Sequence, residues 1–163
     1  MAESAAQWFQ EQLASSTEII IWAVGQVPST RWHRQPPFGG WSPARHLFHL
    51  LYYEETLALP SLRQWQGGPM PMPPLAGEEL SWRHDHDVEE LLAAFQAVRE
   101  QEVALLDELA GADWDLPRPT IWGEHTLRWV LTKSYQHTLD HANSLLQMAL
   151  YWDDALRGRH ARA

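Results

Sequence analysis

The sequence contains no cysteine, and this excludes several kinds of chemistry. Without a thiol the chain can form no disulfide framework, no thiolate metal site and no cysteine nucleophile. Any metal that this chain binds must therefore be held by imidazole and carboxylate groups. Such ligands suit zinc, nickel, iron or manganese better than soft copper(I).

Basic residues are also scarce, with 12 Lys and Arg against 21 Asp and Glu and a formal net charge of −9. A protein that binds duplex nucleic acid needs a basic surface to displace counterions, so we expect no nucleic-acid partner. The one basic cluster is formed by Arg157, Arg159 and Arg162 near the end of the chain. We interpret residues 154–163 as a frayed tail.

Long hydrophobic runs are missing as well. The most apolar stretch, residues 18–27, is far shorter than the roughly 20 residues that a membrane-spanning helix needs. The first four residues lack the basic start and apolar segment of a signal peptide. We therefore expect a cytoplasmic protein without a membrane partner. At 163 residues the chain suits a single domain, 1–163, with one core of ordinary size.

Four stretches have apolar residues at three- and four-residue steps, the spacing of an amphipathic helix. They cover about residues 4–27, 42–57, 87–109 and 126–152. Ser42 and Pro43 form a strong helix start, because serine caps the first turn and proline tolerates the first helical position. Pro60 should kink or end the second helix, although a short extension to Trp65 is possible.

The sequence predicts an all-α protein, a four-helix bundle, because no strand-like alternation is present and each amphipathic helix must bury its stripe against others. Asp87 or Asp85 caps the third helix. The linker between the second and third helices, about residues 67–80, is rich in proline. It could span roughly 60 Å at full extension, so these two helices can run parallel and simple up-down-up-down order is not forced.

Two histidines one helical turn apart, His137 and His141, are the most informative feature of the chain. This spacing places both imidazoles on one helix face, with Cβ atoms roughly 5–6 Å apart, so that both can reach one cation. Both fall on the stripe that also carries Leu127, Val130 and Leu145, which predicts that they point inward. Inward histidines without a metal would form a polar core and would each need a hydrogen-bond partner.

A third imidazole from another helix would complete a three-histidine site with open positions, as in catalytic zinc centres. The second helix offers His49, but His46 competes with it, and periodicity alone does not choose between them. His84 and His86 lie in a segment that we interpret as a solvated helix cap. We assign the remaining histidines, His33, His125 and His160, to loops or the tail.

Two familiar metal motifs are absent. The gluzincin motif requires Glu directly after the first histidine of the pair, where this chain has Thr138. Ferritin-like di-iron bundles use Glu-x-x-His, and no histidine here has Glu three residues before it. Tyr53 and Glu54, one turn after His49, are candidates for acid–base chemistry, but nothing in the sequence assigns them a role.

The sequence resembles the DinB/YfiT-like family of metalloenzymes. Residues 41–50, WSPARHLFHL, are similar to the start of that family's second helix, where a histidine eight residues after the tryptophan binds metal. Residues 122–131, WGEHTLRWVL, followed by His137 and His141, are similar to its fourth helix. The resemblance selects His49 over His46. It implies an up-down-down-up bundle with a long crossover from helix 2 to helix 3, and a divalent metal on His49, His137 and His141.

Family members of known chemistry are S-transferases and isomerases that use low-molecular-weight thiols such as bacillithiol or mycothiol, and several are homodimers. The resemblance therefore implies a metal-dependent enzyme, a transferase that combines a small thiol with a small-molecule substrate, and a homodimer. Two alternatives remain open. One is a domain that binds metal or a small ligand without turnover, for example in a stress response. The other is a hydrolase in which the metal activates water.

Overall fold

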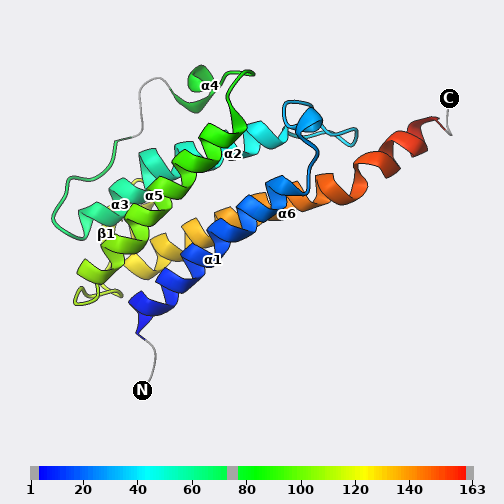
Figure 1. The fold of residues 1–163 in the computed structure, drawn as a ribbon. Helices are drawn as coiled ribbons and strands as arrows, with labels where there is room; N and C mark the ends of the chain where they lie inside the picture. Colours follow the sequence, from blue (N-terminus) through cyan, green and yellow to red (C-terminus); the bar gives the residue numbers. More distant parts are fainter. Residues whose placement is uncertain (1–3, 73–76, 161–163) are drawn as a thin grey trace.

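The helices begin close to the positions that the sequence predicts. The computed structural model describes residues 4–72 and 77–160. Four long helices form the body of the molecule, and η1 and η2 are a 3-10 turn and a π-helical turn (Figure 1). The elements are α1 (Ala5–Gly25), η1 (Ser29–Arg31), α2 (Pro43–Tyr53), η2 (Glu54–Ala58), α3 (Leu59–Gln64), α4 (Gly77–Ser81), α5 (Val88–Glu108), β1 (Arg118–Thr120), β2 (Gly123–His125) and α6 (Leu127–His160).

Side-chain caps fix where three of the long helices start. The hydroxyls of Ser4 and Ser42 each accept a hydrogen bond from the backbone N–H three residues later, at 3.2 and 3.3 Å. The carboxylate of Asp87 accepts bonds from the N–H groups two and three residues later, at 2.8 and 3.1 Å. Asp87 rather than Asp85 is therefore the cap of α5.

The four long helices run up, down, down and up. Gln10 near the start of α1 donates a hydrogen bond to the carbonyl of Val103 near the end of α5, at 3.2 Å, so these helices are antiparallel. The first turns of α1 and α6 share one apolar cluster, through Phe9 and Leu127, so these two are parallel. The first turns of α2 and α5 share another. The all-α, up-down-down-up bundle that the resemblance implies is thus the observed fold.

The helix that starts at Pro43 continues past Pro60, so the expected break at this proline is not observed. The wider turn of η2 intervenes: the N–H of Leu59 bonds to the carbonyl of Glu54, five residues back. Helix α3 then carries Pro60 in its first turn, where the missing N–H costs little. The predicted extension toward Trp65 is α3.

Three segments differ from the prediction. The linker 67–80 includes the short helix α4, and residues 73–76 lie outside the described part. A small antiparallel hairpin, β1–β2, occupies the loop before α6. The tail is helical as far as His160, whereas 161–163 are not described. An i,i+3 ion pair between Asp154 and Arg157 supports this last part of α6, which extends beyond the other helices (Figure 1).

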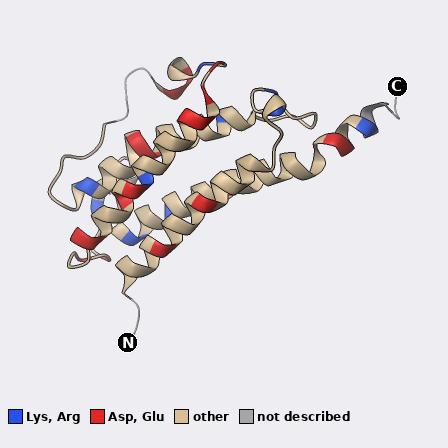
Figure 2. Cartoon of the chain, viewed as in Figure 1, with Lys and Arg blue, Asp and Glu red and all other residues tan. Residues whose placement is uncertain are grey.

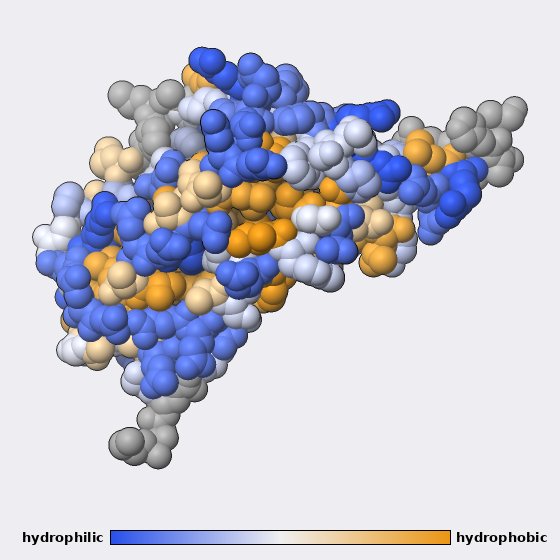
Figure 3. All heavy atoms as spheres, viewed as in Figure 1, coloured by the Kyte–Doolittle hydropathy of each residue, from blue (hydrophilic) through white to orange (hydrophobic). Residues whose placement is uncertain are grey.

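Figures 2 and 3 show, from one side, how charged and apolar residues are distributed over the molecule. In the view of Figure 2 the basic residues lie at separate positions rather than in one stripe. Apolar residues follow the line where α1 and α5 meet (Figure 3). The groove of about 340 Å³ between these helices has no histidine in its lining. Among residues 4–72 and 77–160, no helix has both the length and the apolar character needed to cross a membrane.

Two large apolar clusters fill the bundle. A buried ionic cluster lies between them. Arg99 of α5 donates to Glu54 at 2.8 Å and to Glu102 at 2.9 Å. It also donates to the hydroxyls of Ser134 and Thr138 on α6, at 3.0 and 2.8 Å. The five side chains are all at most 3 % exposed. This cluster therefore joins α2–η2, α5 and α6 at one level of the bundle.

Charge balance in the cluster depends on Glu102. Burial is the main cause that raises the pKa of Glu102 well above its usual value, and the negative charge of the neighbouring Glu54 adds to it. A protonated Glu102 leaves one carboxylate, Glu54, to neutralise Arg99. The hydroxyl of Ser134 donates to the carboxylate of Glu54, whose two oxygens lie at 3.0 and 2.9 Å, and gives Glu54 a second hydrogen-bond donor beside Arg99.

Replacing Arg99 with Met should destabilise the protein strongly, because Glu54 would remain buried without a counter-ion. We expect the free energy of unfolding to fall by about 3–5 kcal/mol. Urea denaturation followed by circular dichroism measures this. Arg63→Met is the matched control, since Arg63 is exposed and donates only to Gln101, at 3.1 Å; its effect should stay within about 0.5 kcal/mol. A loss below about 1 kcal/mol for Arg99→Met would contradict the structural role of the cluster.

Candidate metal centre

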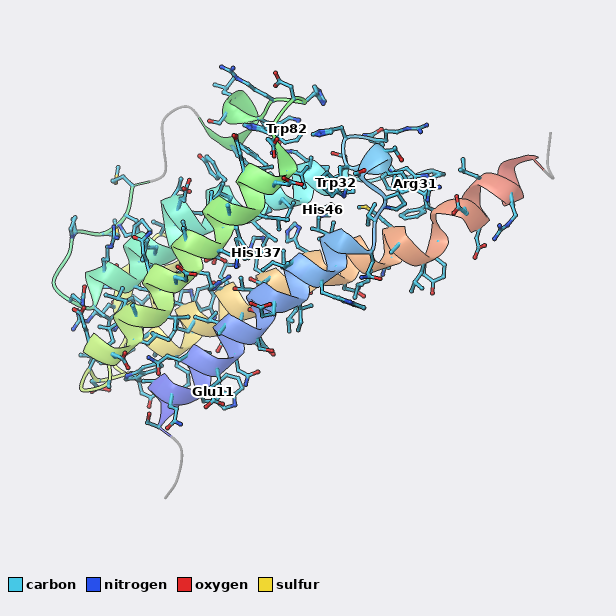
Figure 4. All side chains as sticks on the ribbon, in the orientation of Figure 1. Glu11, Arg31, Trp32, His46, Trp82 and His137 are labelled. Carbon is cyan, nitrogen blue, oxygen red and sulfur yellow. The ribbon has the colours of Figure 1, made fainter. Side chains whose placement is uncertain are left out.

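The candidate site lies between α2 and α6, which are antiparallel neighbours. His46 and His49 lie one turn apart on α2, and His137 and His141 lie one turn apart on α6. Figure 4 shows His46 and His137 in the interior between helices. The cap of Ser42 and Pro43 sets the start of α2, and the Arg99 cluster holds α6 at the residues on both sides of His137. These two constraints bring the pairs of histidines face to face.

The structure brings His49, His137 and His141 together. The Nε2 atom of His137 lies 3.0 Å from Nε2 of His49 and 3.2 Å from Nε2 of His141. One ring nitrogen from each residue lies within 4.8 Å of the others. Two nitrogens bound at 2.0–2.1 Å to a tetrahedral zinc ion are about 3.3 Å apart. The spacing of the three imidazoles thus fits a single small divalent cation.

His49 is oriented by a carboxylate that the sequence did not reveal. Its Nδ1 lies 2.7 Å from Oε2 of Glu78 on α4. A carboxylate oxygen can only accept, so Nδ1 carries the proton and Nε2 offers its lone pair toward the other histidines. Arg45 forms ion pairs with Glu78, at 2.7 Å, and with Glu79, at 2.5 Å, and so holds α4 against α2.

His46 lies behind the cluster rather than in it. Its Nδ1 is 2.7 Å from Nδ1 of His141, so the two rings share a proton on the side that faces away from Nε2 of His141. This contact fixes the ring orientation of His141 in the way that hydrogen-bonded partners orient metal-binding histidines. Periodicity alone does not choose between His46 and His49 as the third ligand. In the structure His49 belongs to the cluster, whereas His46 is the partner of His141.

His137 lacks such a partner. Its Nδ1 is buried without a hydrogen bond, and so is the hydroxyl of Tyr53, whose ring centre lies 4.4 Å from that of His137. A cation bound at Nε2 would leave this Nδ1, on the other side of the ring, without a partner. The three converging Nε2 lone pairs are therefore what indicates that the residues present fit a metal ion.

Three imidazoles at this site, those of His46, His137 and His141, are neutral near pH 7. Burial is the main cause that lowers the pKa of His46 to about 4 and that of His137 to about 3. Neighbouring histidines add to the effect, and burial lowers the pKa of His141 as well. Neutral imidazole is the form that binds metal, so His137 and His141 need no proton loss to accept a cation.

Aromatic side chains border the cluster on two sides. Trp41 covers one side: its ring centre is 5.0 Å from that of His49 and 6.2 Å from that of His141. Hollows of about 380 and 330 Å³ lie on either side of Trp41. Tyr53 and Trp122, with ring centres 6.1 Å apart, border the site near His137. Aromatic rings therefore border the cluster both at His49 and at His137.

The other candidates lie apart from the cluster. Glu54, considered for acid–base chemistry, is committed to Arg99 and Ser134. His33 and His84 are exposed, as their assignment to solvated segments predicts. His86 stacks on Phe48 with ring centres 4.8 Å apart, and the ring of His125 stacks on Trp129 at 3.6 Å. The side chain of His160 lies outside the described part.

The fold and the site define an all-helical protein whose bundle carries a three-histidine cluster able to hold a metal ion. The family model of the DinB superfamily matches residues 12–145, so the chain belongs to this superfamily. This confirms the resemblance seen in residues 41–50 and 122–131. Comparisons with curated proteins and with solved structures give no match.

The low pKa values predict how the metal-free protein responds to acid. In the unfolded chain His46 and His137 bind protons below about pH 6.5, whereas in the folded protein they stay neutral until the pH is lower. Stability is therefore fully present above pH 6.5 and falls as the pH drops toward the folded pKa values of about 4 for His46 and 3 for His137. Urea midpoints of chelator-treated protein at about pH 7.5 and about pH 5 measure the loss.

The variant His46→Gln isolates the histidine contribution from that of carboxylates such as Glu102. It removes one titrating group, so its midpoint should depend less on pH than that of the parent protein. The difference amounts to at most about 1.4 kcal/mol per pH unit. Equal pH dependence in the two proteins would contradict the burial of a neutral His46.

The carboxylate of Glu78 should strengthen metal binding through His49. Replacing Glu78 with Ala removes the partner of Nδ1, and loss of such partners weakens metal affinity by about 10–100-fold. Competition with a chromophoric chelator measures the Zn²⁺ dissociation constant. Glu79→Ala is the matched control, because Glu79 pairs with the same arginine, Arg45, but contacts no histidine. Equal affinities of the two variants would show that Glu78 has no such role.

Proposed function

We propose that this protein holds one divalent transition-metal ion on His49, His137 and His141 and is a metal-dependent enzyme. The observation that carries the proposal is the convergence of the Nε2 atoms, at 3.0 and 3.2 Å from that of His137, in a bundle of the DinB superfamily. Three neutral ligands leave the charge of the cation uncompensated and leave positions open for a substrate, which is the pattern of catalytic rather than structural sites.

The reaction that we propose is the transfer of a low-molecular-weight thiol to an electrophile. When bound, the cation would lower the pKa of a thiol or a water molecule that reaches it. The chain has no cysteine, so a sulfur nucleophile must come from a small molecule. The resemblance to thiol S-transferases of the family supports this choice over water.

The protein's own residues supply orientation and exclude water. Glu78 and His46 fix the rings of His49 and His141 through their Nδ1 atoms. Trp41 is 38 % exposed and lies across the cluster, where it limits the access of water. The hollow of about 380 Å³ beside Trp41 is also lined by His46, the partner of His141, and offers room for an electrophile near the cluster. The site therefore combines a positioned cation with a largely dry surrounding, which strengthens electrostatic effects.

A single variant tests both parts of the proposal. Protein purified without a histidine tag and loaded with Zn²⁺, Ni²⁺, Fe²⁺ or Mn²⁺ should hold about one equivalent of one of them. His137→Ala should lose the metal while helical content is largely kept. Incubation with bacillithiol and monochlorobimane, followed by fluorescence, should show metal-dependent conjugation in the parent protein and its loss in the variant.

The control is His84→Ala, which removes an exposed histidine outside the cluster. It should keep both the metal and the conjugation. Metal content below about a tenth of an equivalent in the loaded parent protein would contradict the metal site. Stoichiometric metal without conjugation of any thiol would instead favour a binding domain without turnover, and metal-dependent ester hydrolysis would favour the hydrolase.

A further inference from the structure

The part of the site beyond His137 contains a positive charge that the proposed chemistry does not yet use. Lys133 is the only lysine of the sequence and lies one helical turn before His137 on α6. The two side chains therefore project from the same face of the helix.

The ammonium group of Lys133 is held by aromatic rings. Its Nζ lies 5.7 Å from the ring centre of Trp122 and 5.8 Å from that of Trp129. Cation–π contacts of this kind fix the position of a lysine without neutralising its charge. Lys133 is half-buried, so the group is partly withdrawn from solvent yet still open to it.

No carboxylate neutralises this lysine. Among residues 4–72 and 77–160, the ion pairs involve arginines or His49, and none includes Lys133. In a chain with 21 acidic residues, a half-buried cation without an acidic partner is unusual. The charge is available for an external anion at this end of the site.

The aromatic rings connect Lys133 to the metal cluster. Trp122 lies 5.7 Å from Trp129 and 6.1 Å from Tyr53, and Tyr53 lies 4.4 Å from His137, all between ring centres. From His137 to Lys133 the helix rises about 6 Å. Lys133 and His137 thus lie one turn apart on one face of α6, with the rings of Trp122 and Tyr53 beside them.

We propose that Lys133, with Trp122 and Trp129, forms a subsite for the carboxylate of an anionic thiol whose sulfur reaches the His49–His137–His141 cluster. This rests on the proposed function and names its substrate class: small thiols that carry a carboxylate two or more atoms from the sulfur. The lysine acts as a point charge that selects the anion. Trp41, at the other end of the cluster, is left for the electrophile.

Three thiols of matched size and different charge test the subsite: mercaptoacetate (anionic), 2-mercaptoethanol (neutral) and cysteamine (cationic). Isothermal titration calorimetry on Zn²⁺-loaded protein at neutral pH gives their dissociation constants. Lys133→Met should weaken mercaptoacetate binding by about tenfold, which is the effect of one charge-assisted contact, and leave 2-mercaptoethanol within about twofold. Lys133→Arg keeps the charge and should keep most of the preference.

The control variant Arg128→Met removes a positive charge from the same helix at a position that pairs with Asp115, at 3.0 Å, and contacts none of the three histidines. It should leave all three constants unchanged, which separates a local contact from the overall charge of the protein. Thermal unfolding of every variant confirms that the bundle is intact.

The outcomes separate the subsite from the proposed function. If Lys133→Met weakens all three thiols equally, or none, the subsite is wrong while thiol binding at the cluster stands. If the parent protein binds none of the three thiols, the proposed function fails and the subsite fails with it. Selective loss of mercaptoacetate binding that Lys133→Arg restores supports the proposal.

Discussion

The antiparallel contact between α2 and α6 is the constraint on which the rest of this structure depends. The buried cluster around Arg99 sets it, because Glu54 on one side and Ser134 and Thr138 on the other are held by the same guanidinium group. Burying a guanidinium group with two carboxyl groups is expensive, and Nε of Arg99 and Oε1 of Glu102 have no hydrogen-bond partner among the described residues. In this protein the cluster fixes the register of α2 against α6. It lies one turn from the histidines and decides which faces of these two helices meet.

Around that contact the site is arranged in layers. Three imidazoles converge, and two of them have their outer nitrogens held by groups from different elements, Glu78 from α4 and His46 from α2. Among the described residues, the outer nitrogen of His137 has no hydrogen-bond partner, and its ring packs against that of Tyr53. Burial keeps His137 and His141 neutral, which is the protonation state that binding of a cation requires.

Much of the fold could be predicted because the helix caps and the spacing of apolar residues in the sequence agree with how the helices pack. Caps at Ser42 and Asp87 and a 3.6-residue periodicity fix the long helices, and a proline-rich linker allows the crossover. The pairing of His137 with His141 is a local helix property and was visible in sequence. The choice of His49 came from resemblance, because His46 lies one turn earlier on the same helix.

What could not be predicted depends on contacts between residues far apart in the chain. Glu78 lies 29 residues from His49, in a segment that composition identifies as linker, and only folding places α4 against α2. Glu54 looked like a candidate acid or base, but its partner Arg99 is 45 residues away. The turn η2 depends on how the chain passes Pro60 while packed, which periodicity does not encode.

The central claim is that three imidazoles from α2 and α6 share one cation. X-ray absorption at the metal edge of the loaded, tag-free protein tests it most directly. The account predicts a first coordination shell with three nitrogen ligands at about 2.0–2.1 Å and the multiple-scattering pattern of imidazole rings. A shell made of oxygen ligands, or one with a single imidazole, would contradict it.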